Sequence, residues 1–207
     1  MNERDRLTMH NLAIAVRFLS VRQVARLRDC SHQTAFRLAK RLVTKGWARR
    51  IRLLAQPIEI FAPLAKWKPG FAKPNAAVIS KAANSRYRNV PMQEVEAVTA
   101  TNRTLQHFGL DSRTPLKRFQ QTHDLGLSET FVHFWRRWPR LTHRCWIGED
   151  CYRGSRGRGE KVEDAQLRSP QTGETLLVVE FTGKYKATRV TDFIDDVVAR
   201  QLPFVCY

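Results

Sequence analysis

Two acidic residues near the end of the chain are the first candidates for chemistry. Asp164 lies in KVEDAQL and Glu180 in LLVVEFTGK, and both runs have the apolar pattern of β-strands. Neighbouring antiparallel strands can bring two such carboxylates within reach of one Mg²⁺, which prefers oxygen ligands. Lys184, which follows soon after Glu180, could then orient water or stabilise a pentavalent phosphate. The alternative is that Asp164 and Glu180 are exposed strand-end charges or members of salt bridges.

A second candidate site is a cationic helix near the start of the chain. After Ser31, apolar residues recur with helical spacing, so one face is expected to pack on a core and the other to stay polar. The core set is Ala35, Phe36, Leu38, Ala39 and Leu42. Polar side chains at the start of such a helix can read base edges in the major groove of DNA, and cations can contact phosphates.

The pattern divides the predicted DNA contacts into two groups. Base edges are assigned to Gln33, Thr34 and Arg37, because Arg can read guanine and Gln can read adenine. Phosphates are assigned to Lys40, Arg41, Arg49, Arg50 and Arg52. The alternative is an ordinary solvated helix face, or a module that binds another protein.

The charge of the chain favours a polyanionic partner. Its 207 residues include 36 Lys and Arg against 19 Asp and Glu, which gives a net charge of +17. Residues 1–62 hold 13 basic against 4 acidic residues, residues 63–115 hold 8 against 3, and residues 116–207 hold 15 against 12. We therefore expect double-stranded DNA as the partner, bound mainly by the N-terminal third. RNA binding is disfavoured, because no aromatic RNA-recognition motif is visible.

Several classes of protein are disfavoured by composition. The sequence contains no run of about 18 apolar residues, so no membrane span is predicted. The start MNERDRLTMHN lacks the apolar stretch of a secretory signal. The cysteines, Cys30, Cys145, Cys151 and Cys206, form no CxxC pair, so neither a disulfide framework nor a structural zinc site is predicted. We expect a cytoplasmic protein without membrane contact and without a cofactor, apart from Mg²⁺ in the catalytic alternative.

The elements that would hold the cationic helix have the order of a winged helix-turn-helix. Ser20 is a good N-cap for the helix VRQVARLR, and Ser31 is one for a helix that Gly46 ends. WARRIRLL and IEIFAP, separated by AQP, predict a two-stranded hairpin. We assign residues 1–62 to this DNA-binding domain. Its class often binds palindromic DNA as a two-fold dimer, so a homodimer is compatible with the sequence.

The rest of the chain predicts a connecting segment and a second domain, which gives an α+β fold class. Residues 63–115 are expected to be a linker and connecting segment, because they contain several prolines. Residues 116–207 predict the order α-β-β-β-α-β, with the apolar strand TLLVVEF in the centre of a sheet and helices on both sides.

This second domain resembles the PD-(D/E)xK nuclease fold, whose motif is an Asp followed by a strand that ends in Glu-x-Lys. Asp164 and Glu180 match the two acidic positions. Thr182 stands at the lysine position, however, and Lys184 lies two residues later. Glu163 precedes Asp164 where the motif has proline. The resemblance therefore implies a nuclease-like domain, and we favour one that does not catalyse cleavage. In the alternative, an active nuclease, Asp164 and Glu180 are the candidate metal ligands.

The chain as a whole resembles the replication-relaxation family of plasmids and integrative elements, which joins a winged helix to a nuclease-like domain. The resemblance is carried by LSVRQVARL, TAFRLAKRLVTKGWARR, PLAKWKPG, THDLGLSETFV, VEDAQL and VVEFTGK. It implies a DNA-binding regulatory or accessory protein of a mobile element, acting in transcription, replication or transfer. It also implies a structural role for His123 and Asp124, in helix capping and contacts to the sheet, with His123 as general base the alternative. The competing function is a Mg²⁺-dependent endonuclease that uses Asp164, Glu180 and Lys184.

Overall fold

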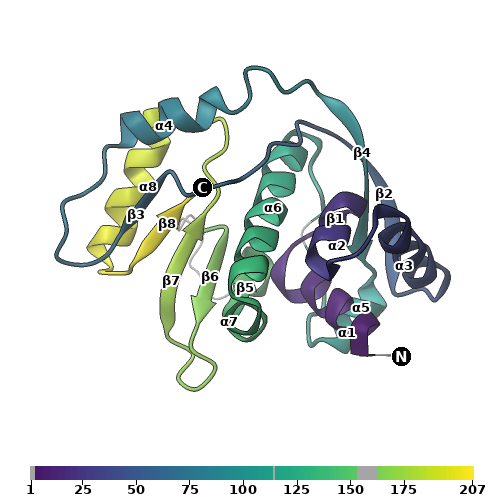
Figure 1. Ribbon diagram of the computed structural model, residues 1–207. Coiled ribbons are helices and arrows are strands. Elements are labelled where there is room, and N and C mark those ends of the chain that lie inside the picture. Colours follow the sequence, from purple (N-terminus) through teal and green to yellow (C-terminus); the bar gives the residue numbers. More distant parts are fainter. Residues whose placement is uncertain (1–2, 114, 153–162) are drawn as a thin grey trace.

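A computed structural model describes residues 3–113, 115–152 and 163–207. The fold is mixed α+β, with one three-stranded and one five-stranded sheet. The long helix α6 (Gln121–Arg137) stands between the two sheets (Figure 1). None of the described helices is long and apolar enough to cross a membrane.

The first sheet is antiparallel and has the strand order β1-β4-β2. Its central strand is therefore contributed by the latest of the three in sequence. The elements of this half are α1 (Glu3–His10), the π-helical turn η1 (Asn11–Ala15), β1 (Leu19–Ser20), α2 (Val21–Arg28), α3 (His32–Thr44), β2 (Ala48–Ala55), β4 (Gln93–Ala100) and α5 (Asn102–His107).

Side-chain caps fix where α2 and α3 begin, as the sequence predicts. The Ser20 hydroxyl accepts a hydrogen bond from the Gln23 backbone N–H, and the Gln23 side chain accepts one from the Ser20 N–H, which forms a capping box. The Ser31 hydroxyl accepts from the Thr34 N–H at the start of α3. Between the helices Asp29 has φ 48°, the left-handed conformation that ends α2 and turns the chain.

The predicted hairpin after α3 is wrong in its second strand. β2 does pair with an antiparallel neighbour, but that neighbour is β4, with Ala48 opposite Ala100 and Ala55 opposite Gln93. The segment IEIFAP lies in no strand, although Ile58 and Ile60 alternate into the core as they would in one. The alternation of apolar residues predicts a strand here. The segment forms none, because its backbone has no neighbouring strand to pair with among the described residues.

Residues 63–115, predicted as a linker, supply strands to both sheets. After β2 the chain crosses to form β3 (Ala65–Trp67) and α4 (Ala76–Ser85), and then returns as β4. The prolines of this segment lie outside those elements, at positions where no backbone N–H is needed for a ladder. These prolines therefore mark the ends of elements.

The second sheet has the order β3-β8-β7-β6-β5. Strands β5, β6 and β7 are antiparallel neighbours, whereas β7 and β8 run parallel and are joined by the crossover helix α8. The predicted order α-β-β-β-α-β is therefore present. Its elements, with the short helices beside them, are η2 (Arg118–Gln120), α6, α7 (Pro139–Cys145), β5 (Trp146–Gly148), η3 (Glu149–Cys151), β6 (Ala165–Arg168), β7 (Thr175–Glu180), α8 (Ala187–Ala199) and β8 (Phe204–Cys206).

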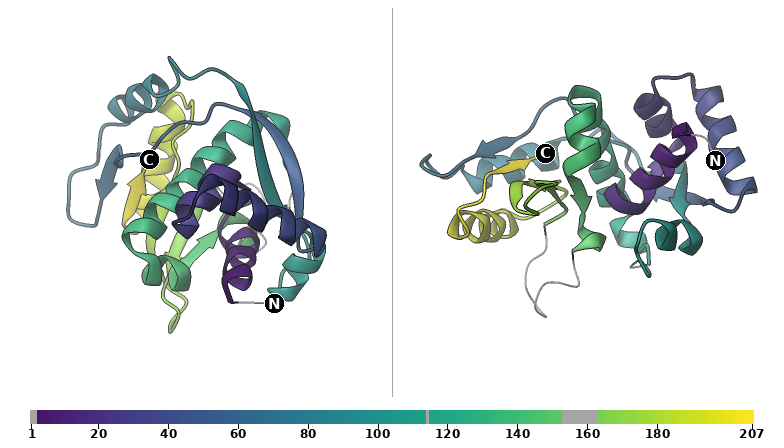
Figure 2. Two further views of the ribbon diagram at one scale, coloured as in Figure 1. Left: turned by 45° about the vertical axis from the view of Figure 1, so that its right-hand side comes forward. Right: turned by 90° about the horizontal axis from the view of Figure 1, so that it is seen from below.

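Helices cover both faces of this sheet, as the apolar character of β7 predicts (Figure 2). Val178 and Phe204 pack with the buried face of α8, together with Ile79 of α4. Val179 and Phe181 belong instead to the larger core, which includes Phe131 of α6 and continues into the helices of the first half. One core thus joins the two sheets through α6.

Gly126 allows α6 to approach the sheet closely. Gly126 lies inside the uninterrupted helix α6. A Cβ at this position would overlap the ring of Phe181, which is fully buried. The absence of a side chain is therefore what lets the helix and the ring pack against each other.

We expect Gly126→Ala to destabilise the protein, against the trend for helices. Alanine in a helix interior normally gains about 1 kcal/mol over glycine. Overpacking a filled core costs about 1–3 kcal/mol, and this cost should dominate at Phe181. Urea unfolding should show a lower free energy of unfolding for Gly126→Ala, and the double variant with Phe181→Leu should recover part of the loss. A Gly126→Ala protein more stable than wild type would contradict the close approach.

Candidate functional site

The outer face of α3 presents the residues predicted to contact bases. Ala35, Leu38, Ala39 and Leu42 are buried, and the predicted contacts Gln33, Thr34, Arg37 and Lys40 are exposed. Phe36, predicted in the core, is instead 37% exposed. It lines a hollow of about 320 Å³ between α3 and the β2–β4 pair, together with Lys40 and Arg50. An aromatic ring therefore accompanies the cations on this face.

Arg41 is held by an acidic residue of α1. Its Nη2 lies 2.5 Å from Asp5 Oδ1, and its Nε donates to Asp5 Oδ2 over 3.3 Å. This hydrogen bonding raises the pKa of Arg41, and burial opposes the rise. Asp5 is itself buried, and Lys45 Nζ lies 4.0 Å from it. Arg41 thus binds within the protein, which leaves less of its charge for a phosphate.

The arginines of β2 fall into two groups. Arg50 lies 2.7 Å and 2.8 Å from the carboxylate oxygens of Glu96 on β4, and Arg52 Nη1 lies 3.5 Å from Glu94. Arg49 points to the other face of the strand, since side chains alternate along β2. Arg49 is exposed and forms no ion pair with any residue that the structure describes. The same holds for Arg37 and Lys40, so these three cations are the ones left for a ligand.

The two candidate carboxylates lie side by side and are buried. Asp164 directly precedes β6 and Glu180 ends β7. The register that pairs Ala165 with Val179 places Asp164 opposite Glu180. Their exposed fractions are 7% and 5%, so they are not exposed strand-end charges. One oxygen of Asp164, Oδ2, accepts a hydrogen bond of 2.8 Å from the backbone N–H of Phe181.

Lys184 is not brought to the carboxylates by any described contact. Its side chain is exposed, and Nζ lies 5.0 Å from the ring centroid of Tyr87, a cation–π contact. Thr182, at the motif's lysine position, is buried and its hydroxyl has no hydrogen-bond partner among the described residues. Among all the residues that the structure describes, no three His, Cys, Asp or Glu side chains are placed to hold a metal ion.

His123 joins the carboxylate site to α6. Its Nε2 lies 3.3 Å from Asp164 Oδ2, and its Nδ1 lies 3.4 Å from Asp124 Oδ1. Its ring stacks on Tyr185, with centroids 5.9 Å apart. His123 therefore contacts the residue before β6, as expected, whereas Asp124 contacts His123 and Arg17. Neither residue caps the helix, because α6 begins without a side-chain cap.

The charges around His123 hold it in its protonated form. Burial disfavours the charge, yet Asp164 and Asp124 together raise the pKa of His123 well above its usual value. On the other side Arg17 Nη1 lies 3.3 Å from Asp124 Oδ2, and Arg17 Nη2 lies 3.0 Å from Asp150 Oδ1. Opposite charges thus alternate through the interior from Asp150 to Asp164.

Sequence reasoning missed the acidic partners of the predicted phosphate contacts. Asp5 lies 36 residues from Arg41, and Glu96 lies 46 residues from Arg50. Residues so far apart along the chain produce no local sequence pattern that would reveal their pairing. The one available signal is the match of the basic run RIR in β2 to the acidic run EVE in β4, which becomes informative only once the two strands are known to pair.

Comparisons with known proteins identify no relative of this chain. No protein-family model matches the chain, and no curated protein or solved structure matches it significantly. The function proposed below rests on the residues, on their geometry and on the sequence resemblance given above.

The raised pKa of His123 predicts a pH-dependent stability. Because the folded state favours the protonated ring, this contribution is complete below the unfolded pKa of about 6.5 and is lost as pH rises through the higher folded pKa. We expect the Tm of the wild type to fall relative to that of His123→Gln between about pH 6 and pH 9.

Thermal unfolding of both proteins across this range is the measurement. His10 and His133, whose pKa values are lowered mainly by burial, are common to both proteins, so their contribution cancels in the difference. Parallel Tm profiles for the two proteins would show that His123 is not charged between the two carboxylates.

Proposed function

We propose that this protein binds double-stranded DNA through α3, as a regulatory or accessory protein of a plasmid or integrative element. The observation that carries the proposal is the outer face of α3. This face exposes Gln33, Arg37 and Lys40 while the opposite face is anchored in the core. Polar and cationic side chains at this position match the needs of a recognition helix in the major groove.

The elements around α3 support a winged helix-turn-helix arrangement. α2 and α3 are joined by the short turn at Asp29, and α3 leads directly into β2. In this arrangement β2 and β4 act as the wing, and Arg49, on the face of β2 opposite to Arg50, supplies a phosphate contact. The wing belongs to a sheet whose central strand begins at Gln93, so the DNA-binding unit extends beyond residues 1–62.

The second sheet is proposed to be a nuclease-like platform that does not cleave DNA. The support is the place of Lys184, which lies over the Tyr87 ring, and the use of Asp164 as a partner of the Phe181 N–H and of His123. A group that would stabilise charge on a scissile phosphate is therefore engaged elsewhere. This combination of a reading module and a silent nuclease-like domain is what the resemblance to the replication-relaxation family implies.

We expect Arg37→Ala to reduce both affinity and sequence discrimination. Loss of a base contact costs about 1–3 kcal/mol on the preferred site and relaxes specificity there. Lys40→Ala and Arg49→Ala should instead weaken binding to all sequences and reduce the salt slope, since phosphate contacts release counterions. The measurement is binding of the full chain to sites selected from random duplex DNA, at several salt concentrations.

Arg50 provides the matched control for Arg49 on the same strand. Because Arg50 is paired with Glu96, Arg50→Ala should change affinity and salt slope less than Arg49→Ala does. Equal losses for Arg37→Ala on selected and random duplexes would remove Arg37 from base reading. Unchanged duplex binding in Arg37→Ala, Lys40→Ala and Arg49→Ala together would overturn the proposed role of α3.

The proposal also predicts no cleavage of DNA by the purified protein. Supercoiled plasmid is incubated with wild type, Asp164→Asn and Glu180→Gln in the presence of Mg²⁺ or Mn²⁺. We expect all three proteins to leave the plasmid intact, because without a placed cation the barrier rises by several kcal/mol. Cleavage by wild type that both substitutions abolish would establish the endonuclease with Asp164, Glu180 and Lys184 instead.

A further inference from the structure

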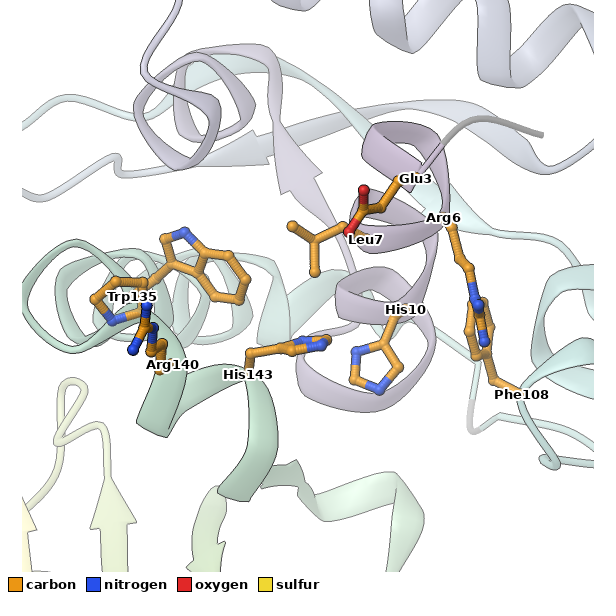
Figure 3. A pocket seen from close by; sticks show the side chains of 9 residues that line it. Glu3, Arg6, Leu7, His10, Phe108, Trp135, Arg140 and His143 are labelled. Atoms are coloured by element: carbon orange, nitrogen blue, oxygen red, sulfur yellow. The ribbon is translucent and has the colours of Figure 1, made fainter.

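A second hollow lies beside α1. Its volume is about 620 Å³, within the range of pockets that enclose small ligands. It is formed by α1, by Phe108 after α5, and by the region where α6 meets α7 (Figure 3). Neither the proposed DNA contacts nor the buried carboxylates use these residues.

Four rings follow one another along the pocket, as Figure 3 shows. The centroids of Trp135 and His143 are 6.0 Å apart, those of His143 and His10 are 5.0 Å apart, and those of His10 and Phe108 are 5.4 Å apart. All three pairs meet edge to face, with interplanar angles of 74°, 67° and 84°. Of the four rings, His143 is exposed and the other three are half-buried, so His143 offers the most open ring surface on which another planar group can stack.

Cations stand beside these rings. Arg6 and Arg140 line the pocket, both side chains are exposed, and neither forms an ion pair with a residue in the described ranges. Glu3 is the one acidic residue in the lining. The pocket therefore offers more positive than negative charge next to its aromatic wall.

One ring carries a hydrogen-bonding group without a partner. His10 Nδ1 is buried and makes no hydrogen bond to any described residue. Burial lowers the pKa of His10, and the neighbouring His143 lowers it further, so the ring is neutral at physiological pH. A neutral imidazole adds no charge to the pocket, whose cations are Arg6 and Arg140.

From the row of rings and the unpaired cation Arg140 beside it, we propose that this pocket binds a single unpaired nucleotide. The base stacks on the exposed ring of His143, and the phosphate is held by Arg140, the cation at the Trp135 end of the row. Aromatic platforms flanked by cations are the general means by which proteins hold unpaired bases. This site is separate from the duplex contact proposed for α3, and it can exist whether or not that contact does.

The test is calorimetric titration of the full chain with deoxyadenosine monophosphate, adenosine, inorganic phosphate and a six-residue single-stranded oligodeoxyadenylate. We expect the monophosphate to bind more tightly than adenosine or phosphate alone, since it alone engages both rings and cations. An oligonucleotide that binds more tightly than the monophosphate identifies a strand as the source, and equal affinity identifies a free nucleotide. Both results uphold the site.

Substitutions on one helix supply the matched control. Arg140→Ala should raise the Kd for the monophosphate about tenfold, whereas Arg144→Ala, also exposed on α7 but outside the lining, should leave it unchanged. His143→Ala, at an exposed position, should also raise the Kd about tenfold through lost stacking. Circular dichroism melts verify that each variant is folded.

Three results would overturn the proposal. One is no binding of the monophosphate or the oligonucleotide at millimolar concentration by folded wild type. Another is phosphate binding as tight as monophosphate binding, which would leave no role for the rings. The third is an equal Kd for Arg140→Ala and Arg144→Ala. Arg37→Ala serves to separate the two sites, because it should impair duplex binding and leave the nucleotide Kd unchanged.

Discussion

A row of alternating charges inside the protein is the interaction on which the rest of the structure depends. It runs from Asp150 through Arg17, Asp124 and His123 to Asp164, and so links η3, the segment before β1, α6 and the second sheet. Removing one member of a buried ion pair typically costs about 3–5 kcal/mol, because the remaining charge is left uncompensated. The row therefore fixes the rotation and depth of α6, against which both sheets are packed.

The same row explains why the acidic residues of the second sheet look catalytic in the sequence. A buried Asp beside a buried Glu is the pattern of a metal site, and the sequence shows only the acidic residues themselves. Once Asp164 is paired with His123 and bonded to the Phe181 N–H, it has a structural reason to be acidic. Short-range patterns cannot tell these two reasons apart, because His123 is 41 positions away along the chain.

Features set by neighbouring residues were predictable, and features set by distant ones were not. The starts of α2 and α3 follow from Ser20 and Ser31, whose caps are local hydrogen bonds. The exposure of the α3 cations also follows from helical spacing, although Phe36 departs from it. The partner of β2 did not follow, because IEIFAP offers the nearer alternation and β4 lies beyond an intervening helix and strand. The acidic partners of Arg41 and Arg50 were hidden for the same reason.

Between β2 and β4 the chain crosses to the second sheet and back, and this affects how the protein folds during synthesis. The first sheet lacks its central strand until residue 100 has been synthesised, and β3 must wait for β8, since the Leu64 N–H donates to the Cys206 carbonyl. Contacts between such distant residues slow folding, because the entropy cost of closing long loops comes before any stabilising contact forms. The nascent chain therefore leaves the ribosome with exposed apolar strands, and its two sheets assemble late and as one cooperative unit.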